Sequence, residues 1–314
     1  MKTILLLTTA IVCSSWGFYA HKQINYYAVF LLPPEMLVFY KPHIDYITEH
    51  AVDADKRRYA LAAEGPRHFI DIDHYGVYPY DSLPRSWPQA LAKYSADTLQ
   101  SHGIVPWWIQ VMLGRLTKAF KEKDQAGILK LSADIGHYIA DAHVPLHASS
   151  NHNGQKTNQH GIHAFWESRI PELLAENAWD FFIGQANYLS QPLSFTWDRV
   201  LESAAAADSV LALERALNSQ FSPDRKFSFE LRNGQLIRQY ATDYCLAYDK
   251  LLNGMVERRM RQSIYAVASF WYTAWVNAGQ PDLKGMELSV EDKEEMEVLN
   301  REWIKGNLKG RGCE

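Results

Sequence analysis

Metal-type ligands are concentrated between His137 and Glu167. Two pairs, His137/Asp141 and His163/Glu167, have their members four residues apart, and His147 lies between the pairs. Four residues are about one helical turn, so both side chains of a pair leave the same face and can close on one ion. A single pair of this spacing is more often a surface salt bridge than a metal site. Three such features within one short stretch favour a metal site.

The distribution of histidine supports this interpretation. All 12 histidines lie between His21 and His163, and the last 151 residues of the chain contain none. A random scatter would not leave half of the chain empty. We therefore expect a histidine-built site in the first half and a helical scaffold in the second.

The elements that must position these ligands can be read from the apolar pattern. A helix is expected from about Asp124, with Leu129, Leu131, Ile135 and Ile139 on its core face. Pro145 should end or bend it, so His147 is expected on the following turn. Residues 150–161 are rich in Asn, Gly, Gln and Thr and predict a loop beside the proposed metals.

The remaining pattern predicts an all-α fold. Further helices are expected at about 169–190, 193–218, 227–253 and 256–278, and no strand-rich region or internal repeat is visible. Residues 75–90 are rich in Tyr, Pro and Ser and predict an irregular loop. We expect one domain over residues 16–284, followed by a charged C-terminal tail at 285–314.

Composition places limits on the partners. Hydrophobic residues make up 47% of the 314 residues, which is enough to bury a core, and the formal net charge is −4. This mild acidity argues weakly against a nucleic-acid binder with a broad basic surface. It does not argue against a site in which metal ions supply the positive charge.

The N-terminus predicts export. Residues 1–15 have a positive start at Lys2, an apolar centre and the small residue Ser15, as in a secretory signal peptide. The apolar run is too short to span a bilayer, and no later stretch is long and apolar enough. Cleavage near Ser15 predicts a secreted or periplasmic protein. It would leave Cys245 and Cys313, whose positions do not suggest a disulfide framework.

Two further groups of ligand types precede the dense stretch. If cleavage follows Ser15, Trp16 would offer a free amino group and a carbonyl that can chelate a metal together, and His21 follows five residues later. The HFID sequence contributes His68, and Asp53 or Asp55 lies upstream of it. A self-paired charged turn also explains the DADKRR run, so the choice between these aspartates stays open on spacing alone.

This order of residues resembles the zinc-dependent phospholipase C and single-strand nuclease superfamily. The resembling features are W-x4-H at the mature N-terminus, an Asp, HFID, H-x3-D-x5-H and H-x3-E, and they cover Trp16 to Glu167. The resemblance implies a secreted, all-helical phosphodiesterase with three zinc ions in one cleft.

The resemblance also implies a role for each matching residue. Trp16 and His21 look like ligands of an N-terminal zinc site. His68, His137 and Asp55, preferred over Asp53 for its AD context, look like a second site. Asp141 would bridge these two zincs, and His147, His163 and Glu167 look like the third site. Asp55 would also serve as general base. Glu167, where the nucleases tend to carry Asp, favours the phospholipase branch.

The ligand chemistry agrees with these expectations. Imidazole and carboxylate suit zinc, and zinc can turn a water into a nucleophile near neutral pH while paired metals clamp an in-line displacement at phosphorus. The expected substrate is a phosphodiester, with phospholipid at a membrane surface as the leading class. The absence of an HExxH sequence argues against a metallopeptidase.

Two alternatives remain at this point. A single-strand nuclease of the same superfamily would need aromatic platforms for single-stranded nucleic acid, for which the sequence offers Tyr78, Tyr80, Trp87, Trp107 and Trp108. A zinc-binding periplasmic relative without turnover would retain the same ligands.

Overall fold

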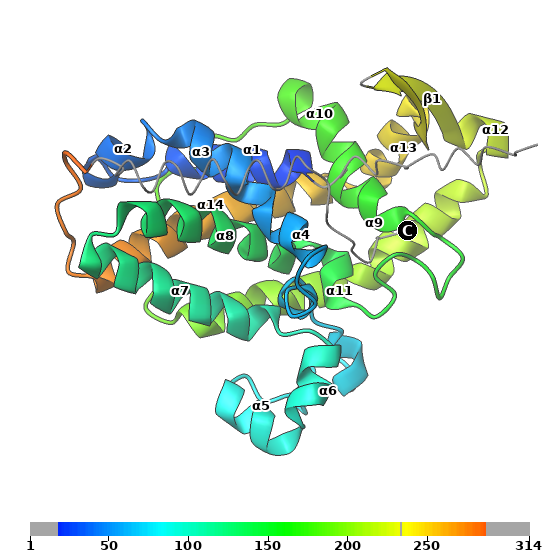
Figure 1. Ribbon diagram of the computed structural model, residues 1–314. Coiled ribbons are helices and arrows are strands. Elements are labelled where there is room, and N and C mark those ends of the chain that lie inside the picture. The colour runs from blue at the N-terminus through cyan, green and yellow to red at the C-terminus, as the bar shows by residue number, and fades with distance from the viewer. Residues whose placement is uncertain (1–17, 233, 287–314) are drawn as a thin grey trace, which may run out of the picture.

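A computed structural model describes residues 18–232 and 234–286 of the chain. Five helices of 12 residues or more form the main bundle: α1 (Phe18–Val29), α7 (Val105–Glu122), α8 (Gln125–His143), α11 (Pro192–Asn218) and α14 (Met255–Asn277). α8 packs against α1, α7, α11 and α14, and Figure 1 shows it above α7 and in front of α14. The described residues thus form a single, mainly helical domain, as the sequence predicted.

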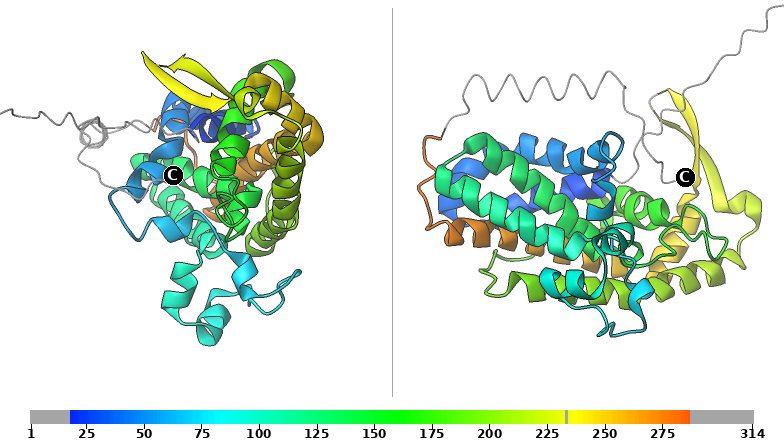
Figure 2. Two further views of the ribbon diagram at one scale, coloured as in Figure 1. Left: turned by 90° about the vertical axis from the view of Figure 1, so that its right-hand side faces the viewer. Right: turned by 60° about the horizontal axis from the view of Figure 1, so that its bottom comes forward.

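Shorter elements surround this bundle. The short helices are α2 (Pro34–Tyr40), α3 (Ile44–Glu49), α4 (Asp53–Arg58), α5 (Trp87–Lys93), α6 (Ala96–Ser101), α9 (Ile162–Ala164), α10 (Ile170–Ala178), α12 (Pro223–Lys226) and α13 (Thr242–Leu252). Tight turns are the 3₁₀ segments η1 (His50–Val52), η2 (Gly65–Arg67), η3 (Ile72–Tyr75) and η4 (Pro145–Ala148), and the π-helical turn η5 (Phe165–Arg169). Figure 2 shows α5 and α6 projecting below the bundle.

The helix that carries the first ligand pair begins and ends where its sequence requires. The Asp124 side chain caps α8 by accepting a hydrogen bond from the Gly127 amide at 2.9 Å. Ile128, Leu129 and Ile135 are fully buried in the larger of two apolar cores. Pro145 follows the helix end at His143, and Val144 is extended there. The helix is therefore fixed at both ends and along one face.

The second apolar core lies beneath the other ligand pair. It joins Phe165 and Trp166 to residues of α11 and α13, with Val210, Tyr244 and Tyr248 completely buried. The part of the chain after Glu167, which contains no histidine, thus supplies most of the packing behind the second ligand pair.

The expected helix at 227–253 is wrong in its first part. Residues 227–240 form a hairpin of β1 (Phe227–Arg232) and β2 (Gln235–Tyr240), paired antiparallel, and only α13 is helical. The sequence FSFELR alternates apolar and polar side chains, which is the period of a strand, and Gly234 supplies a φ of +77° in the turn.

The expected helix at 169–190 is also too long. α10 ends at Ala178, and the chain then runs without regular structure to Gln191, with Gly184 at a φ of +108°. The predicted helices at 193–218 and 256–278 correspond to α11 and α14. Among helices of the described residues, none combines the length and apolar character needed to cross a bilayer.

Candidate metal centre

The first ligand pair lies on one face of α8, as its spacing predicted. His137 and Asp141 are both buried, and His137 Nε2 lies 3.3 Å from Asp141 Oδ2. The ring of His137 is held from behind, because its Nδ1 donates a hydrogen bond to the Ala51 carbonyl at 2.9 Å. Its other nitrogen therefore faces Asp141.

His147 lies on η4, directly after the end of α8. Its Nδ1 donates to the His68 carbonyl at 2.7 Å, and the Ile70 amide donates back to the His147 carbonyl at 2.9 Å. These two bonds join the turn after α8 to the HFID segment, which is far from it in sequence. His147 and His68 are consequently fixed relative to each other.

The second ligand pair is carried by α9 and the π-helical turn η5. His163 Nε2 lies 2.7 Å from Glu167 Oε2, and His147 Nε2 lies 3.4 Å from the same oxygen. The extra residue in a π-helical turn changes the direction of the side chains that follow it, and such turns are common at functional sites. Phe165 and Trp166 of this turn are buried, so Glu167 is rigidly placed.

Three remote segments complete the cluster. From α1, His21 Nε2 reaches Glu167 Oε1 at 2.9 Å and Asp141 Oδ1 at 3.4 Å. His68 Nδ1 lies 2.9 Å from Asp141 Oδ2. From α4, Asp55 Oδ1 lies 3.7 Å from His137 Nε2. Asp141 therefore stands between the groups, where the resemblance places a bridging carboxylate.

All eight described side chains that the sequence singled out as ligands come together here. Among the described residues, their ligand atoms form four overlapping groups, each within 4.8 Å: His21/Asp55/His137, His68/His137/Asp141, His147/His163/Glu167 and His21/Asp141/Glu167. The ninth, Trp16, lies outside the described residues, as do the expected signal peptide and most of the expected tail. The role of Trp16 as a ligand, the signal peptide and the charged tail stay predictions.

The structure also separates the two candidate aspartates. Asp53 accepts from His50 Nδ1 at 2.5 Å and from Lys56 Nζ at 2.8 Å, and it belongs to none of the four groups. Asp55 is two residues further along α4 and faces His137 and His68. The preference for Asp55 therefore agrees with the geometry.

The protonation pattern fits a metal. The Nδ1 atoms of His137 and His147 both bond to backbone carbonyls, which only accept, so each Nδ1 carries a proton. In the neutral imidazole, Nε2 then has a free lone pair directed into the cluster, as a metal ligand requires. A buried set of imidazoles and carboxylates is the donor set that zinc prefers.

The electrostatics describe a cluster of opposite charges. Burial opposes charge on His137 and His147, yet Asp141 raises the pKa of each to about 9, aided by Asp55 at His137 and by Glu167 at His147. Burial also opposes charge on Asp141, but His137 and His147 hold its pKa well below the usual range. Protons and metal ions would thus compete for the same imidazole nitrogens.

One buried carboxylate near the site was not identified from the sequence. Glu64 has no exposed surface, and its Oε1 lies 3.8 Å from His68 Nε2, a buried nitrogen that has no hydrogen-bond partner among the described residues. Glu64 accepts hydrogen bonds from Tyr138 and, at 2.5 Å, from Arg67. Its position four residues before His68 is the signal that could have revealed it.

Several aromatic residues considered as base-stacking platforms have other contacts. Trp107 is buried and meets Trp87 and Trp197 edge to face. Trp108 lies under the guanidinium of Arg67 at 3.9 Å. Tyr78 is 61% exposed, whereas Tyr80, Trp87 and Trp108 are half-buried.

Other histidines lie outside the four groups. His102 stacks on His74 with ring centroids 3.4 Å apart, while His152 and His160 are exposed on the 150–161 loop.

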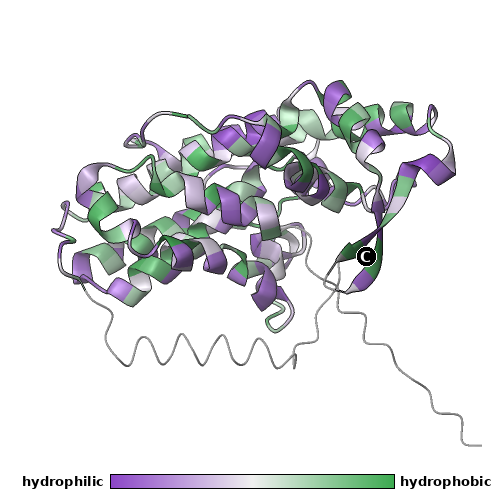
Figure 3. Cartoon of the chain, turned by 90° about the horizontal axis from the view of Figure 1, so that it is seen from above, coloured by the Kyte–Doolittle hydropathy of each residue, from purple (hydrophilic) through white to green (hydrophobic). Residues whose placement is uncertain are grey.

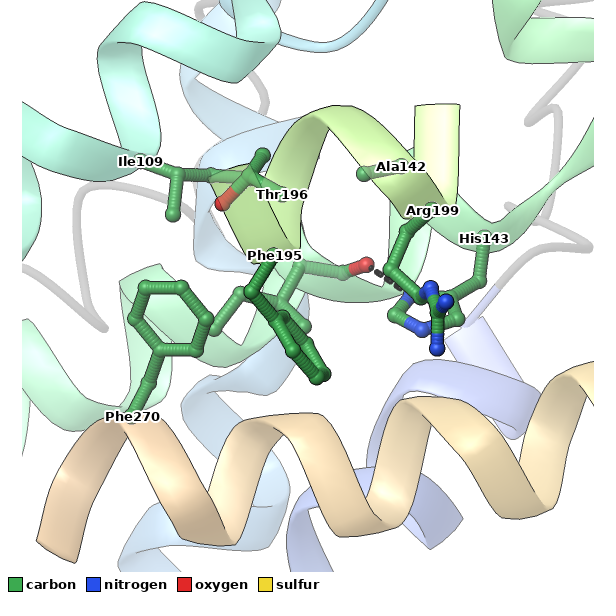
Figure 4. A pocket seen from close by; sticks show the side chains of 8 residues that line it. Ile109, Ala142, His143, Phe195, Thr196, Arg199 and Phe270 are labelled. Carbon is green, nitrogen blue, oxygen red and sulfur yellow. Dashed lines mark hydrogen bonds between the residues drawn. The ribbon is translucent and has the colours of Figure 1, made fainter. Parts of the chain in front are cut away.

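The buried His143 lines a separate small cavity with Arg199, Phe195 and Phe270 (Figure 4). This cavity has a volume of about 10 Å³, room for about one water, so it is not a substrate pocket.

The comparisons with known proteins name no relative: no family model and no curated protein matches this chain. What is established is a helical domain with a buried His/Asp/Glu cluster able to hold metal ions.

Proposed function

We propose that this chain is an exported trinuclear zinc phosphodiesterase with a phospholipase-C-like substrate. The observation that carries the proposal is the convergence of eight buried or half-buried ligand side chains from separate segments into four overlapping groups. A cluster that could hold neighbouring ions suits phosphodiester hydrolysis, because bound zinc supplies a water of lowered pKa and positive charge for the attacking and leaving oxygens.

The ligand side chains are assigned to three proposed zinc sites. His68, His137 and Asp55 would hold one ion, His147, His163 and Glu167 another, and His21 with Trp16 a third. Asp141 would bridge the first and third sites. These side chains also exclude bulk water from the ligand atoms, since most of them are buried.

Asp55 is the proposed general base. Burial would raise its pKa, but the neighbouring His137 and His68, together with Arg58, lower it below the ordinary value. The carboxylate is therefore ionised at neutral pH and can accept a proton at its oxygens. It is also less buried than the other carboxylates of the cluster, which leaves it accessible to an attacking water.

The lipid substrate is proposed over nucleic acid for two reasons. Glu167 is the carboxylate that favours the phospholipase branch in the resemblance. The aromatic residues suggested for base stacking are partly committed to internal packing, as with Trp87 and Trp107. A single-strand nuclease is the alternative that a substrate panel must test.

The decisive experiment compares substrates on the mature protein beginning at Trp16 and loaded with zinc. Phosphatidylcholine, an aryl phosphodiester and single-stranded nucleic acid are offered side by side. We expect lipid turnover, and we expect His137→Ala and Glu167→Ala each to reduce it by more than about 100-fold, beyond the usual loss for residues that only support ligands.

Matched controls are His160→Ala and Glu122→Ala, which change an exposed histidine and an exposed glutamate outside the cluster. Both controls should keep full turnover. Turnover of nucleic acid alone would move the chain to the nuclease branch. No turnover of any substrate, with about three zinc ions still bound, would contradict the proposed activity and leave a zinc-binding protein.

A further inference from the structure

The β1–β2 hairpin exposes an apolar face at its tip. Strand alternation places Phe229 and Leu231 of β1 on the same face as Leu236 of β2, and these side chains are 65%, 73% and 69% exposed. Leu231 is paired directly with Leu236, so the apolar surface is continuous across both strands. Figure 1 shows the hairpin projecting from the helical body, and Figure 3 shows hydrophobic stretches along it.

An exposed apolar surface of this kind indicates an interaction site. A two-stranded hairpin has little stability of its own, and large apolar side chains gathered on a projection usually mark an interaction site. The other face of the hairpin carries the polar side chains of Ser228, Glu230 and Gln239, together with the half-buried Ile237, which is paired with Glu230. The hairpin is therefore amphipathic, with its apolar face away from the protein at the tip.

The base of the hairpin is fixed to the segment that carries Glu167. Arg169 of η5 donates to Glu230 at 2.6 Å and to the Tyr240 carbonyl at 3.2 Å. Phe165, on the same turn, stacks on Tyr240 with ring centroids 3.9 Å apart. Whatever binds the hairpin tip is thus held at a defined position relative to the His/Asp/Glu cluster.

The chemistry of the tip suits a phospholipid bilayer. Arg238 lies on the apolar face, exposed, with its guanidinium 3.7 Å from the centre of the Phe227 ring, and Arg225 is exposed at the hairpin base. Long cationic side chains beside a projecting apolar tip can reach lipid phosphates while the tip enters the acyl boundary.

We propose that the hairpin tip inserts into the surface of an anionic phospholipid bilayer and positions the His/Asp/Glu cluster at that surface. This inference rests on the proposed function and names the physical form of its substrate. The probes are vesicles of phosphatidylcholine with phosphatidylglycerol and vesicles of phosphatidylcholine alone. Binding is measured by sedimentation of the mature zinc-loaded protein.

The test variant replaces the tip residues together, Phe229→Ser/Leu231→Ser/Leu236→Ser. Its control replaces three exposed apolar residues elsewhere, Leu61→Ser/Val77→Ser/Phe182→Ser, which are 52%, 86% and 86% exposed. We expect the tip variant to lose vesicle binding by at least about 10-fold, since three apolar side chains no longer leave water. The control variant should bind as the unchanged protein does, and Arg238→Gln should weaken binding to the anionic vesicles alone.

Turnover of a soluble aryl phosphodiester, measured on the same proteins, separates the two proposals. Retained turnover with lost vesicle binding supports the inference, whereas absent turnover in the unchanged protein would count against the proposed function instead. Equal vesicle binding by the tip variant and the control would overturn the inference. So would self-association that the tip variant abolishes in a protein that binds no vesicles, because the partner would then be a second copy.

Discussion

At the scale of single residues, the cluster depends on side chains that orient the ligands. His137 and His147 are oriented by backbone carbonyls, whereas His68 faces the cluster through Nδ1 and turns Nε2 towards Glu64. Burial would raise the pKa of Glu64, but Tyr138 and Arg57 keep it below the ordinary value, so the carboxylate is charged. The negative charge of Glu64, 3.8 Å from His68 Nε2, favours a proton on that nitrogen and leaves Nδ1 as the metal ligand.

Glu64→Gln tests this role. The amide would lack the charge that favours a proton on His68 Nε2, so metal affinity should fall by about 10- to 100-fold. Competition for zinc with a chromophoric chelator measures this metal affinity. Glu49→Gln, which changes an exposed glutamate on α3, is the control. Unchanged zinc affinity in a folded Glu64→Gln protein would show that Glu64 supports only Arg67 and Tyr138.

At the scale of elements, the two helices that meet in the cluster approach very closely. His21 on α1 stacks on His137 on α8, with ring centroids 4.0 Å apart. The neighbouring Gly136 makes this possible, since a Cβ there would lie 2.0 Å from Asn25 Oδ1. Asn25 is buried and donates to the Ala133 and Ile47 carbonyls, so it cannot move aside without losing those bonds.

Gly136→Ala should therefore lower the free energy of unfolding by about 1–3 kcal/mol, the usual cost of overpacking. Urea unfolding followed by circular dichroism measures the change. Gly114→Ala on α7 is the matched control, because a Cβ there meets nothing within 4 Å. That control should raise the stability by up to about 1 kcal/mol through helix propensity. Equal effects of the two substitutions would contradict the close approach of α1 and α8.

At the scale of the whole molecule, metal ions would link segments that are far apart in the chain. The four ligand groups draw on α1, α4, α8, η4, the HFID segment and the α9–η5 region. Ions bound to the folded state alone add to its stability, and their removal subtracts from it. The part of the chain after Glu167 contributes packing and the hairpin, but no residue of these groups.

The stability gained from zinc should depend on pH with a defined sign. His137 and His147 have pKa values raised to about 9 in the folded chain, above the ordinary value of about 6.5. Without metal, their protonation stabilises the fold fully below about pH 6.5, and this contribution is lost as pH rises through 9. Zinc must displace these protons, so the zinc-dependent rise in Tm should grow between pH 6.5 and 9.

Calorimetric unfolding with zinc and with a chelator, at several pH values in that window, measures this difference. A zinc-dependent rise in Tm that shrinks with increasing pH would contradict the proton competition. The control is His160→Ala, whose exposed histidine lies outside the cluster and should leave the pH profile unchanged.

The sequence by itself determined the ligand types and the local elements. Spacing of four residues placed His137 with Asp141, and Pro145 placed His147 on a turn, because helical periodicity and proline act over a few residues. The helical class followed from the same periodicity. The helix predicted from the sequence at 227–253 missed the hairpin at 227–240. An alternating segment borders a true helix there, and short apolar runs do not distinguish strand from helix.

Tertiary structure decided which remote residues meet. That Asp55 faces the cluster while Asp53 pairs with His50 follows from how α4 packs, and two residues of one short segment cannot be distinguished by type. The turn η2 is what places Glu64 behind His68, and this arrangement was not predicted from the sequence. The exposure of the hairpin tip could not be predicted from the sequence either, since burial depends on neighbours that are distant in sequence. Local helix and strand propensity depends on neighbouring residues in the sequence, whereas contacts between distant segments form only when the whole core is packed.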